Sequence, residues 1–464
     1  ESPDEALELD HPPYYRPPVD SPEYRYLAER RAALNGPVPS RTLDIRTPIE
    51  MPDPNVFAEF DAGSGGAEVS TTGAFTRLLR SLARDDRFGR RVVPIIPDEG
   101  RTFGMDALFK ELQIYASQGQ LYEPVDHKLI LSYKESQSGQ ILEQGITEAG
   151  STASWIAAGT SYATRGVPMV PFYTYYSMFG FQRVGDLLWG ASDSRARGFL
   201  LGATSGRTTL VGEGLQHQDG HSHVLASVIP ACQAYDPAFA YELATVVDHG
   251  LKRMYVDNED VYYYLTLYNE SYVQPPKPEG SDQGIIDGLY KWAPAPTGAK
   301  YRATILFSGP AHAAAREAQT TLAEQYGGGA ELWSATSFKK LRDEALSVER
   351  WNNLHPGEGP RVPFVKRQLE GTLGPVIAVT DYMRTVPDQI SRWVPRSYTS
   401  LGTDGYGRSD TRASLREFFE TDADHVVVAT LSALAKDQRI DPNVVRDAIE
   451  RTGVDPDAGD PWTR

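Results

Sequence analysis

From Thr71 onward the chain alternates helical segments with short apolar runs, and this alternation limits its fold more than any other feature. Apolar residues recur at helical spacing in 70–86, 151–166, 182–196 and 237–254, and buried-strand patterns occupy 92–96, 167–179, 198–204 and 260–269. Further on, strands are expected at 301–309, 330–337 and 375–382, helices at 310–327 and 441–453, and a strand followed by a helix at 425–438. Strands that alternate with helices form parallel sheets covered on both faces, so we predict an α/β fold.

The chain outside this pattern reads as connecting segments. Residues 1–45 are rich in proline and acidic side chains and predict an extended connector that contains one short helix ending at Gly36. PPKPEGSDQG at 275–284 has the composition of a linker. The chain starts at Glu1, inside a linker-like stretch, so we expect it to be part of a longer polypeptide.

The composition of the chain disfavours several classes of binding partner. The 464 residues include 46 Lys and Arg against 62 Asp and Glu, a net charge of −16, which disfavours binding to nucleic acid or to an anionic membrane. No apolar run approaches the ~18 residues of a membrane span, and no signal peptide is expected. Cys232 is the single cysteine, which excludes an internal disulfide and a cysteine-based metal cage. We expect a cytoplasmic location.

One dense group of polar side chains lies in GEGLQHQDGHSH, residues 212–223. It holds Glu213, His217, Asp219, His221 and His223 between glycines that let the backbone approach a ligand. Histidine offers acid–base chemistry near neutral pH, and a His/Asp group also suits a metal. A glycine-rich loop whose histidines cap a helix explains the same residues, so spacing alone leaves all three interpretations open.

Three weaker candidates accompany it. Glu148 precedes a run of small residues; a buried carboxyl with a raised pKa and an ordinary helix-start acid are both compatible with that position. An aromatic run indicates either core or a stacking platform; it contains Tyr173, Tyr175, Tyr176, Phe179 and Phe181. Asp98 and Glu99 follow the end of a predicted strand, where parallel sheets bind ligands, although exposed loop acids are common there. Neither GxGxxG after a strand nor GxxxxGK[ST] occurs, so a dinucleotide fold or a P-loop is unsupported.

Four long motifs give a specific resemblance. GQILEQGITEAG (139–150), PFYTYYSMFGFQRVGDL (171–187), ARGFLLGATSGRTTLVGEGLQHQDGHSH (196–223) and LGTDGYGRSDTRASLREFFE (401–420) resemble the homodimeric bacterial type of pyruvate dehydrogenase decarboxylating component. This family depends on thiamin diphosphate and is related to transketolase. The resemblance runs along nearly the whole chain. It implies a thiamin-diphosphate-binding fold with a pyrimidine-binding domain at 46–275 and a transketolase C-terminal-type α/β domain at 285–464.

The resemblance assigns roles to individual positions. Glu148 matches the glutamate that bonds the pyrimidine ring nitrogen and favours the reactive imino tautomer, and Phe179 matches the ring that stacks on the pyrimidine. Tyr176 and His217 match polar groups of the substrate pocket, and Tyr176 is also expected to touch the cofactor. Asp98 and Glu99 match acids near the reacting centre, with Glu99 also at the cofactor. Residues 118–134 match a mobile loop over the site.

The resemblance also implies what the chain lacks. The family holds Mg²⁺ and the diphosphate on a further domain through a Gly-Asp-Gly motif that is absent here, so the Mg²⁺ ligands are expected outside this chain, which looks like the C-terminal half of the enzyme. The implied partners are an N-terminal diphosphate-binding domain or chain, a second copy in a homodimer, pyruvate, and the lipoyl domain of dihydrolipoyl acetyltransferase. The implied reaction is oxidative decarboxylation of pyruvate with reductive acetylation of that lipoyl group. A transketolase-like aldehyde transferase and a non-catalytic assembly subunit are the alternatives.

Overall fold

The computed structural model describes residues 16–34, 36, 45–97, 100–125 and 133–464, and divides into two units by internal packing. One unit comprises Glu1–Pro48 with Ser161–Val167. Its predicted helix is α2 (Pro22–Ala33), which begins after Ser21, whose hydroxyl accepts a hydrogen bond from the N–H of Tyr24 at 3.2 Å. The short helix α7 (Ser161–Thr164) completes the described elements of this unit.

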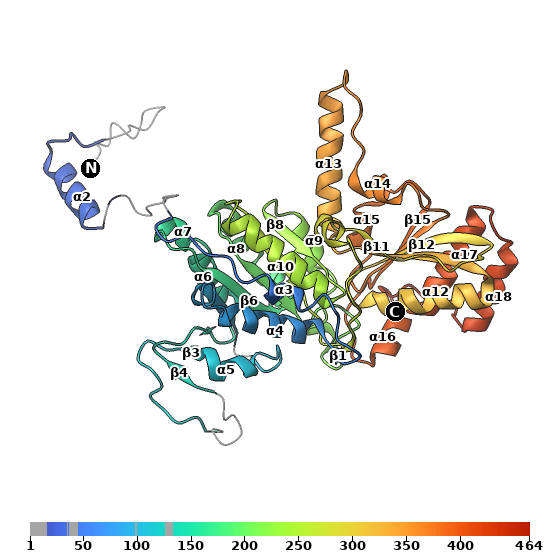
Figure 1. The fold of residues 1–464 in the computed structure, drawn as a ribbon, viewed down its shortest axis with the longest axis horizontal. Helices are drawn as coiled ribbons and strands as arrows, with labels where there is room; N and C mark the ends of the chain where they lie inside the picture. The colour runs from blue at the N-terminus through green and yellow to red at the C-terminus, as the bar shows by residue number, and fades with distance from the viewer. Residues whose placement is uncertain (1–15, 35, 37–44, 98–99, 126–132) are drawn as a thin grey trace. The chain divides into compact units, whose positions relative to one another are not determined.

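The second unit, Ile49–Thr160 with Pro168–Arg464, contains two large sheets (Figure 1). The first sheet has six strands, all parallel, in the order β5 (Leu142–Glu143), β2 (Val92–Ile96), β6 (Val170–Tyr176), β7 (Phe199–Ala203), β9 (Tyr262–Thr266) and β8 (Cys232–Tyr235). Its principal helices are α4 (Thr71–Arg84), α6 (Glu148–Gly159), α8 (Phe181–Asp193), α9 (Ser222–Ser227) and α10 (Ala240–Tyr255). A helix after nearly every strand returns the chain to the same edge, which makes the neighbouring strands parallel.

Helices cover both faces of this sheet. Successive strand residues enter different clusters: Phe199 and Leu201 pack with the side of α4 and α10, whereas Leu200 packs with the side of α6 and α8. This alternation is the two-residue period of a strand, and because both sides are apolar the strand reads as a continuous hydrophobic run. The predicted α/β class is thus confirmed.

The second sheet has five strands in the order β11 (Tyr290–Ala293), β13 (Gly328–Ser334), β12 (Tyr301–Phe307), β14 (Val376–Val379) and β15 (Tyr398–Leu401). The edge strand β11 is antiparallel to β13, and the other pairs are parallel. Helices α12 (His312–Tyr326) and α17 (Ala423–Lys436) pack on one face, and α13 (Phe338–Leu354) and α14 (Phe364–Leu369) on the other.

The expectation of a strand within 425–438 was wrong. Residues 425–436 lie in helix α17, which begins after Asp422, whose carboxylate accepts the N–H of His425 at 2.9 Å. Val426, Thr430 and Leu434 are buried at four-residue intervals against the second sheet. Packing and the cap therefore override the strand preference of three consecutive valines.

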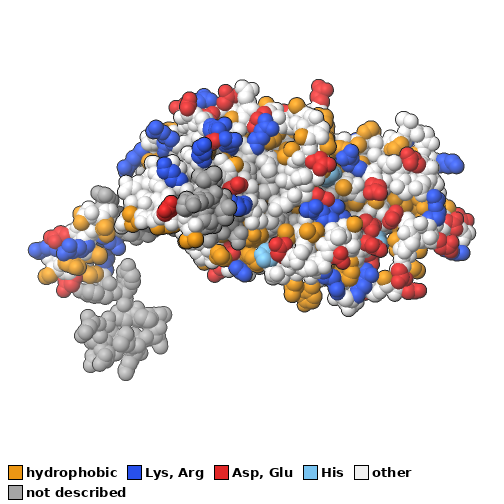
Figure 2. All heavy atoms as spheres, turned by 90° about the horizontal axis from the view of Figure 1, so that it is seen from below, with side chains coloured by type: hydrophobic (Ala, Val, Ile, Leu, Met, Phe, Trp, Pro, Cys, Tyr) orange, Lys and Arg blue, Asp and Glu red, His pale blue; other side chains and the backbone are white. Residues whose placement is uncertain are grey.

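Shorter elements complete the described part of this unit. The small sheets pair β1 (Glu68–Val69) with β10 (Tyr272–Val273) and β3 (Ile114–Tyr115) with β4 (Glu135–Ser136). The remaining helices are α3 (Asn55–Ala58), α5 (Asp106–Leu112), α11 (Asp282–Asp287), α15 (Thr385–Asp388), α16 (Arg412–Phe418) and α18 (Pro442–Thr452). Within the described ranges, no helix combines the length and apolarity that a membrane crossing requires. On the surface seen in Figure 2, acidic, basic and hydrophobic side chains are interspersed.

The two large sheets face each other with their carboxyl ends. Asp236, directly after β8, accepts hydrogen bonds from Thr266 Oγ1 at 2.7 Å, from Ser308 Oγ at 2.6 Å and from the hydroxyl of Tyr268. Ser308 follows β12 of the other sheet, so the carboxylate joins the two strand ends. Buried carboxylates with this many donors are satisfied without water.

Glu242 makes a second junction between the sheets. Its side chain is fully buried near the start of α10 and accepts bonds from the hydroxyls of Ser334 and Tyr290, each at 2.6 Å, and from the N–H groups of Ala238 and Phe239. Burial raises the pKa of Glu242 to about 7 despite these donors. Between its ordinary value of 4.5 and about 7, only the folded protein therefore keeps this proton.

We expect the Glu242→Gln variant to gain stability relative to the wild type as the pH rises from about 5 to 7. The stabilising contribution of a raised carboxyl pKa is complete at low pH and disappears toward the folded pKa, by at most ~1.4 kcal/mol per pH unit. The glutamine can keep its oxygen toward the two backbone N–H groups and its amide toward the two hydroxyls. The measurement is the midpoint of thermal unfolding at several pH values. The exposed Glu324→Gln change on α12 is the control, and a Glu242→Gln difference that stays constant with pH would contradict the prediction.

Candidate functional site

Three of the predicted site residues, Tyr176, Phe179 and His217, lie together beyond the carboxyl ends of two neighbouring strands. Tyr176 is the last residue of β6, and Phe179 ends the 3₁₀ turn Ser177–Phe179 that follows it. His217 lies in the long loop between β7 and α9. Since β6 and β7 are adjacent and parallel, their carboxyl ends bring these three side chains to one place.

These rings form one aromatic cluster. The ring centroid of His217 lies 5.0 Å from that of Tyr176 and 5.0 Å from that of Phe179, both in edge-to-face geometry. Tyr176 also packs on Phe103 at 5.1 Å. The Nδ1 atom of His217 is buried without a hydrogen-bond partner in the part of the chain that the structure describes. The cluster thus fixes the imidazole and leaves this buried ring nitrogen without a described protein partner.

Glu148 connects to this cluster through an arginine. It is the first residue of α6, and Thr147 caps the helix by accepting the N–H of Gly150 at 3.2 Å. The Glu148 side chain is 11% exposed and its Oε2 pairs with the guanidinium of Arg183 at 3.1 Å. The same guanidinium lies over the ring of Phe179, 3.9 Å from its centroid. Glu148 is nearly buried and also begins a helix, so both sequence interpretations stay open, and the ion pair was not foreseen.

The polar side chains of residues 212–223 lie in different environments. Asp219 is fully buried; its Oδ1 accepts from the N–H groups of His221 and Ser222 and from Gln182 Nε2, so it fixes the start of α9. His223 is buried against Thr266, and burial lowers its pKa. Among the described residues, no group of three or more His, Cys, Asp or Glu side chains is arranged to hold a metal ion. Only His217 of the three histidines belongs to the aromatic cluster.

Two predicted residues remain without structural information. Asp98 and Glu99 lie outside the described residues, as does the part of the expected mobile loop at 126–132. The strand that precedes the two acids, β2, is adjacent to β6 in the sheet. Their assignment therefore stays a prediction.

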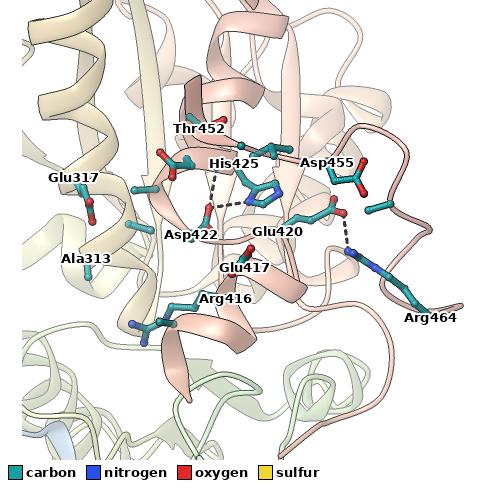
Figure 3. A pocket seen from close by; sticks show the side chains of 17 residues that line it. Ala313, Glu317, Arg416, Glu417, Glu420, Asp422, His425, Thr452, Asp455 and Arg464 are labelled. Atoms are coloured by element: carbon teal, nitrogen blue, oxygen red, sulfur yellow. Dashed lines mark hydrogen bonds and ion pairs between the residues drawn. The ribbon is translucent and has the colours of Figure 1, made fainter. Parts of the chain in front are cut away.

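A separate cavity of about 570 Å³ lies beside α12, α16 and α17, and none of the predicted site residues that the structure describes lines it (Figure 3). Six of its seventeen lining residues are acidic, and two of these acids are already paired: Asp422 with His425 Nδ1 at 2.8 Å and Glu420 with Arg464 at 3.0 Å. Burial alone would lower the pKa of His425, but the bond to Asp422 raises it overall. Satisfied acid–base pairs of this kind are ordinary surface structure.

Sequence reasoning missed Arg183 as part of the site region, whereas Asp219 was named within the polar group at 212–223. Arg183 is separated from Glu148 by 35 residues, and no local spacing relates a helix start to a position on the next helix but one. The available signal was proximity in sequence, because Arg183 lies four positions after Phe179 in the same motif, although Phe179 belongs to the 3₁₀ turn before α8.

Comparisons with known proteins identify the family. Residues 49–275 match the model of the pyruvate dehydrogenase E1 component middle domain, and residues 288–422 match that of the transketolase-like C-terminal domain. The pyruvate dehydrogenase E1 component of Pseudomonas aeruginosa is 52% identical over 455 residues, which are 98% of this chain and 52% of that protein. The E1 component of Mycobacterium tuberculosis is 52% identical over 97% of this chain and 48% of its own length, and that of Escherichia coli K12 is 48% identical over 97% and 50%.

Solved structures show the same fold at low identity. A transketolase from Leishmania mexicana superposes with a TM-score of 0.62 at 16% identity, covering 89% of this chain and 51% of that one. A transketolase from Campylobacter jejuni gives 0.59 at 15% identity, covering 81% and 49%. The chain spans about half the length of the curated relatives it matches. Two domain models in sequence and about 50% identity along nearly all of the chain show that it belongs to the pyruvate dehydrogenase E1 component family.

Proposed function

We propose that this chain supplies the pyrimidine-binding half of a thiamin diphosphate site in an acetyl-transferring pyruvate dehydrogenase. The enzyme would decarboxylate pyruvate oxidatively and reductively acetylate lipoyl groups of dihydrolipoyl acetyltransferase, as the first component of the complex. The observation that carries the proposal is the connected group Glu148–Arg183–Phe179–His217, found in a chain about half identical to proteins named pyruvate dehydrogenase E1 component.

The residues present fit the pyrimidine end of this cofactor. Glu148 offers a nearly buried carboxyl that can bond a ring nitrogen, and Phe179 offers an aromatic face for a planar heterocycle. We propose Tyr176 and Glu99 as further cofactor contacts. When bound, thiamin diphosphate supplies the electron sink that decarboxylation of a 2-oxo acid requires. The ligands of Mg²⁺ are proposed to lie outside this chain, on the diphosphate-binding part.

The chain's own side chains would bind the substrate and control protons. The buried Nδ1 of His217 has no hydrogen-bond partner among the described residues and could donate to a carboxylate or hold a proton near the reacting ketone. Tyr176 fixes the imidazole from one side and keeps water away from it. Asp98 and Glu99 are proposed as acids of the same centre, and Glu148 as the group that shares a proton with the pyrimidine.

The proposed assembly follows from the same assignment. Residues 46–275 would form the pyrimidine-binding domain and 285–464 the transketolase C-terminal-type domain, after a connector at 1–45. A diphosphate-binding domain or chain, a second copy of this chain and a lipoyl domain are the expected partners. We expect no nucleic acid and no membrane among these partners. We expect a cytoplasmic location.

We expect this chain alone to bind thiamin diphosphate very weakly and to decarboxylate no pyruvate. The diphosphate carries most of the cofactor's charge, and its proposed Mg²⁺ anchor lies on the diphosphate-binding partner. Calorimetry with Mg²⁺, before and after addition of the diphosphate-binding part of a relative, measures this. Tight Mg²⁺-dependent binding by the chain alone would contradict the expectation. Turnover of ketose phosphate rather than pyruvate by the assembled enzyme would instead support the aldehyde-transferase alternative.

Glu148→Gln and Glu148→Ala should each reduce pyruvate decarboxylation by about two to four orders of magnitude, the range of a lost acid–base group. Glutamine still donates a hydrogen bond but cannot transfer a proton, and alanine does neither. Cofactor affinity should fall less, because the diphosphate is anchored elsewhere. The measurement is the decarboxylation rate of the assembled enzyme at saturating cofactor.

The control for Glu148 is Asp282→Asn, which removes an acid from the first turn of the exposed helix α11. It should leave the rate near that of the wild type. If Glu148→Gln also kept its rate within about threefold, Glu148 would be a helix-start acid whose charge only interacts with the helix dipole.

His217→Ala should lower kcat/KM for pyruvate ~10- to 100-fold, the worth of a hydrogen bond to a charged group, and leave cofactor affinity nearly unchanged. The imidazole is proposed to contact substrate rather than the pyrimidine. Steady-state kinetics and cofactor titration of the assembled enzyme test this, with His355→Ala on the distant end of α13 as the control. A large loss of cofactor affinity with normal turnover would show that the assignment is wrong.

A further inference from the structure

We propose that the loops following β14 and β15 of the five-stranded sheet set the position of His217, and that Gln218 is the positioning residue through which they act. The inference rests on the role of His217 in the proposed function. It gives the second sheet a role in positioning His217, although none of the described residues of the aromatic cluster comes from that sheet.

The loop that carries His217 is held by the second sheet at its beginning. After β7 ends, the backbone N–H of Thr208 donates to both carboxylate oxygens of Asp381, at 3.1 and 3.2 Å. The buried guanidinium of Arg207 donates to the carbonyls of Thr403 and Gly405. Asp381 follows β14, and the two carbonyls follow β15, so both contacts come from strand ends of the second sheet.

The loop is held again beside His217 itself. The side chain of Gln218 is 1% exposed and its Oε1 accepts the backbone N–H of Arg408 at 2.7 Å. Its Nε2 donates to the carbonyl of Leu210, which closes the loop on itself. Ser409 Oγ donates to the carbonyl of Gly212 at 2.7 Å. Gln218 therefore satisfies one bond within the loop and one to the second sheet's segment.

The tight turn transmits this position to the imidazole. The N–H groups of His217 and Gln218 both donate to the carbonyl of Gly214, at 3.1 and 2.9 Å. Gly214 has a φ of +61°, and a β-carbon there would lie 2.6 Å from the hydroxyl of Ser409. The backbone of His217 is thus located by the second sheet, while its ring packs on Tyr176 and Phe179 of the first.

Moving this turn would lower the reaction rate even if the stability of the fold did not change. Displacing a reacting group by about 1 Å can reduce a rate by ~100-fold even when the fold is intact. Gly407 gives a way to move the turn from the far side: a β-carbon there would lie 2.8 Å from Cβ of Gln218 and 3.0 Å from the carbonyl of Gly214. The backbone of Gly407 is outside the left-handed region, so alanine itself fits its conformation.

The test compares Gly407→Ala with Gly371→Ala, which enters open space on the same part of the chain. Hydrogen exchange of the peptide covering 210–218, measured on this chain, should rise at least ~10-fold in Gly407→Ala and stay unchanged in Gly371→Ala. In the assembled enzyme, Gly407→Ala should lower kcat/KM for pyruvate ~10- to 100-fold with unchanged cofactor affinity. Gln218→Ala removes both bonds without a clash and should have the same effects, so it decides the question if Gly407→Ala does not fold.

A double-mutant cycle distinguishes positioning from general destabilisation. If Gly407→Ala acts through His217, it should reduce the rate by less than about threefold once His217 is already alanine. Equal effects in both backgrounds, or unchanged exchange of 210–218 in both Gly407→Ala and Gln218→Ala, would overturn the proposal. Normal turnover of His217→Ala alone would overturn the proposed role of His217 and this inference with it. An impaired His217→Ala beside a normal Gly407→Ala would overturn only the inference.

Discussion

The second unit is organised by one constraint: two largely parallel sheets meet carboxyl end to carboxyl end, so polar strand ends are buried where solvent would normally satisfy them. Buried acceptors without donors would cost several kcal/mol. Asp236, Glu242 and Asp381 instead receive hydroxyl and backbone N–H donors from across the junction. Burial nevertheless raises the pKa of Asp381 to about 7, which shows how thoroughly water is removed there.

This junction also determines where a site can form. The carboxyl edge of the six-stranded sheet forms both the junction with the five-stranded sheet and the candidate site. The ends of β8 and β9 meet the five-stranded sheet through Asp236 and Thr266, whereas the end of β6 carries Tyr176 and Phe179. β7 lies between these strands, and its outgoing loop contacts both regions. His217 therefore belongs to the site through its ring and to the junction through its backbone.

Local patterns in the sequence were sufficient for most of the fold. Continuous apolar runs predicted β2, β6, β7, β9, β12, β13 and β14 because strands buried on both faces need no polar alternation. The valines of α17 misled the same reasoning, since a cap at Asp422 and packing on the second sheet decide that segment. β15, with four half-buried residues, gave no apolar signal at all.

The site was predictable only where motifs carried it. Glu148, Tyr176, Phe179 and His217 were named from quoted motifs, and the structure brings the last three into direct contact. Their roles remain predictions. Arg183 and Gln218 were not named, because their importance lies in partners 35 and 190 positions away in the chain.

The segment from Gly402 to Thr411 holds the His217 loop largely with its main chain. Thr403 and Gly405 offer carbonyls and Arg408 offers an N–H, while Ser409 adds one side-chain bond to the carbonyl of Gly212. A peptide group is the same whatever side chain it bears, so substitutions in this stretch leave the three main-chain contacts in place unless they add bulk at a glycine or replace Arg408 by proline. An inserted or deleted residue would instead shift every donor and acceptor relative to the loop. For this stretch, the main-chain contacts therefore depend more on the number of residues between β15 and α16 than on their identity.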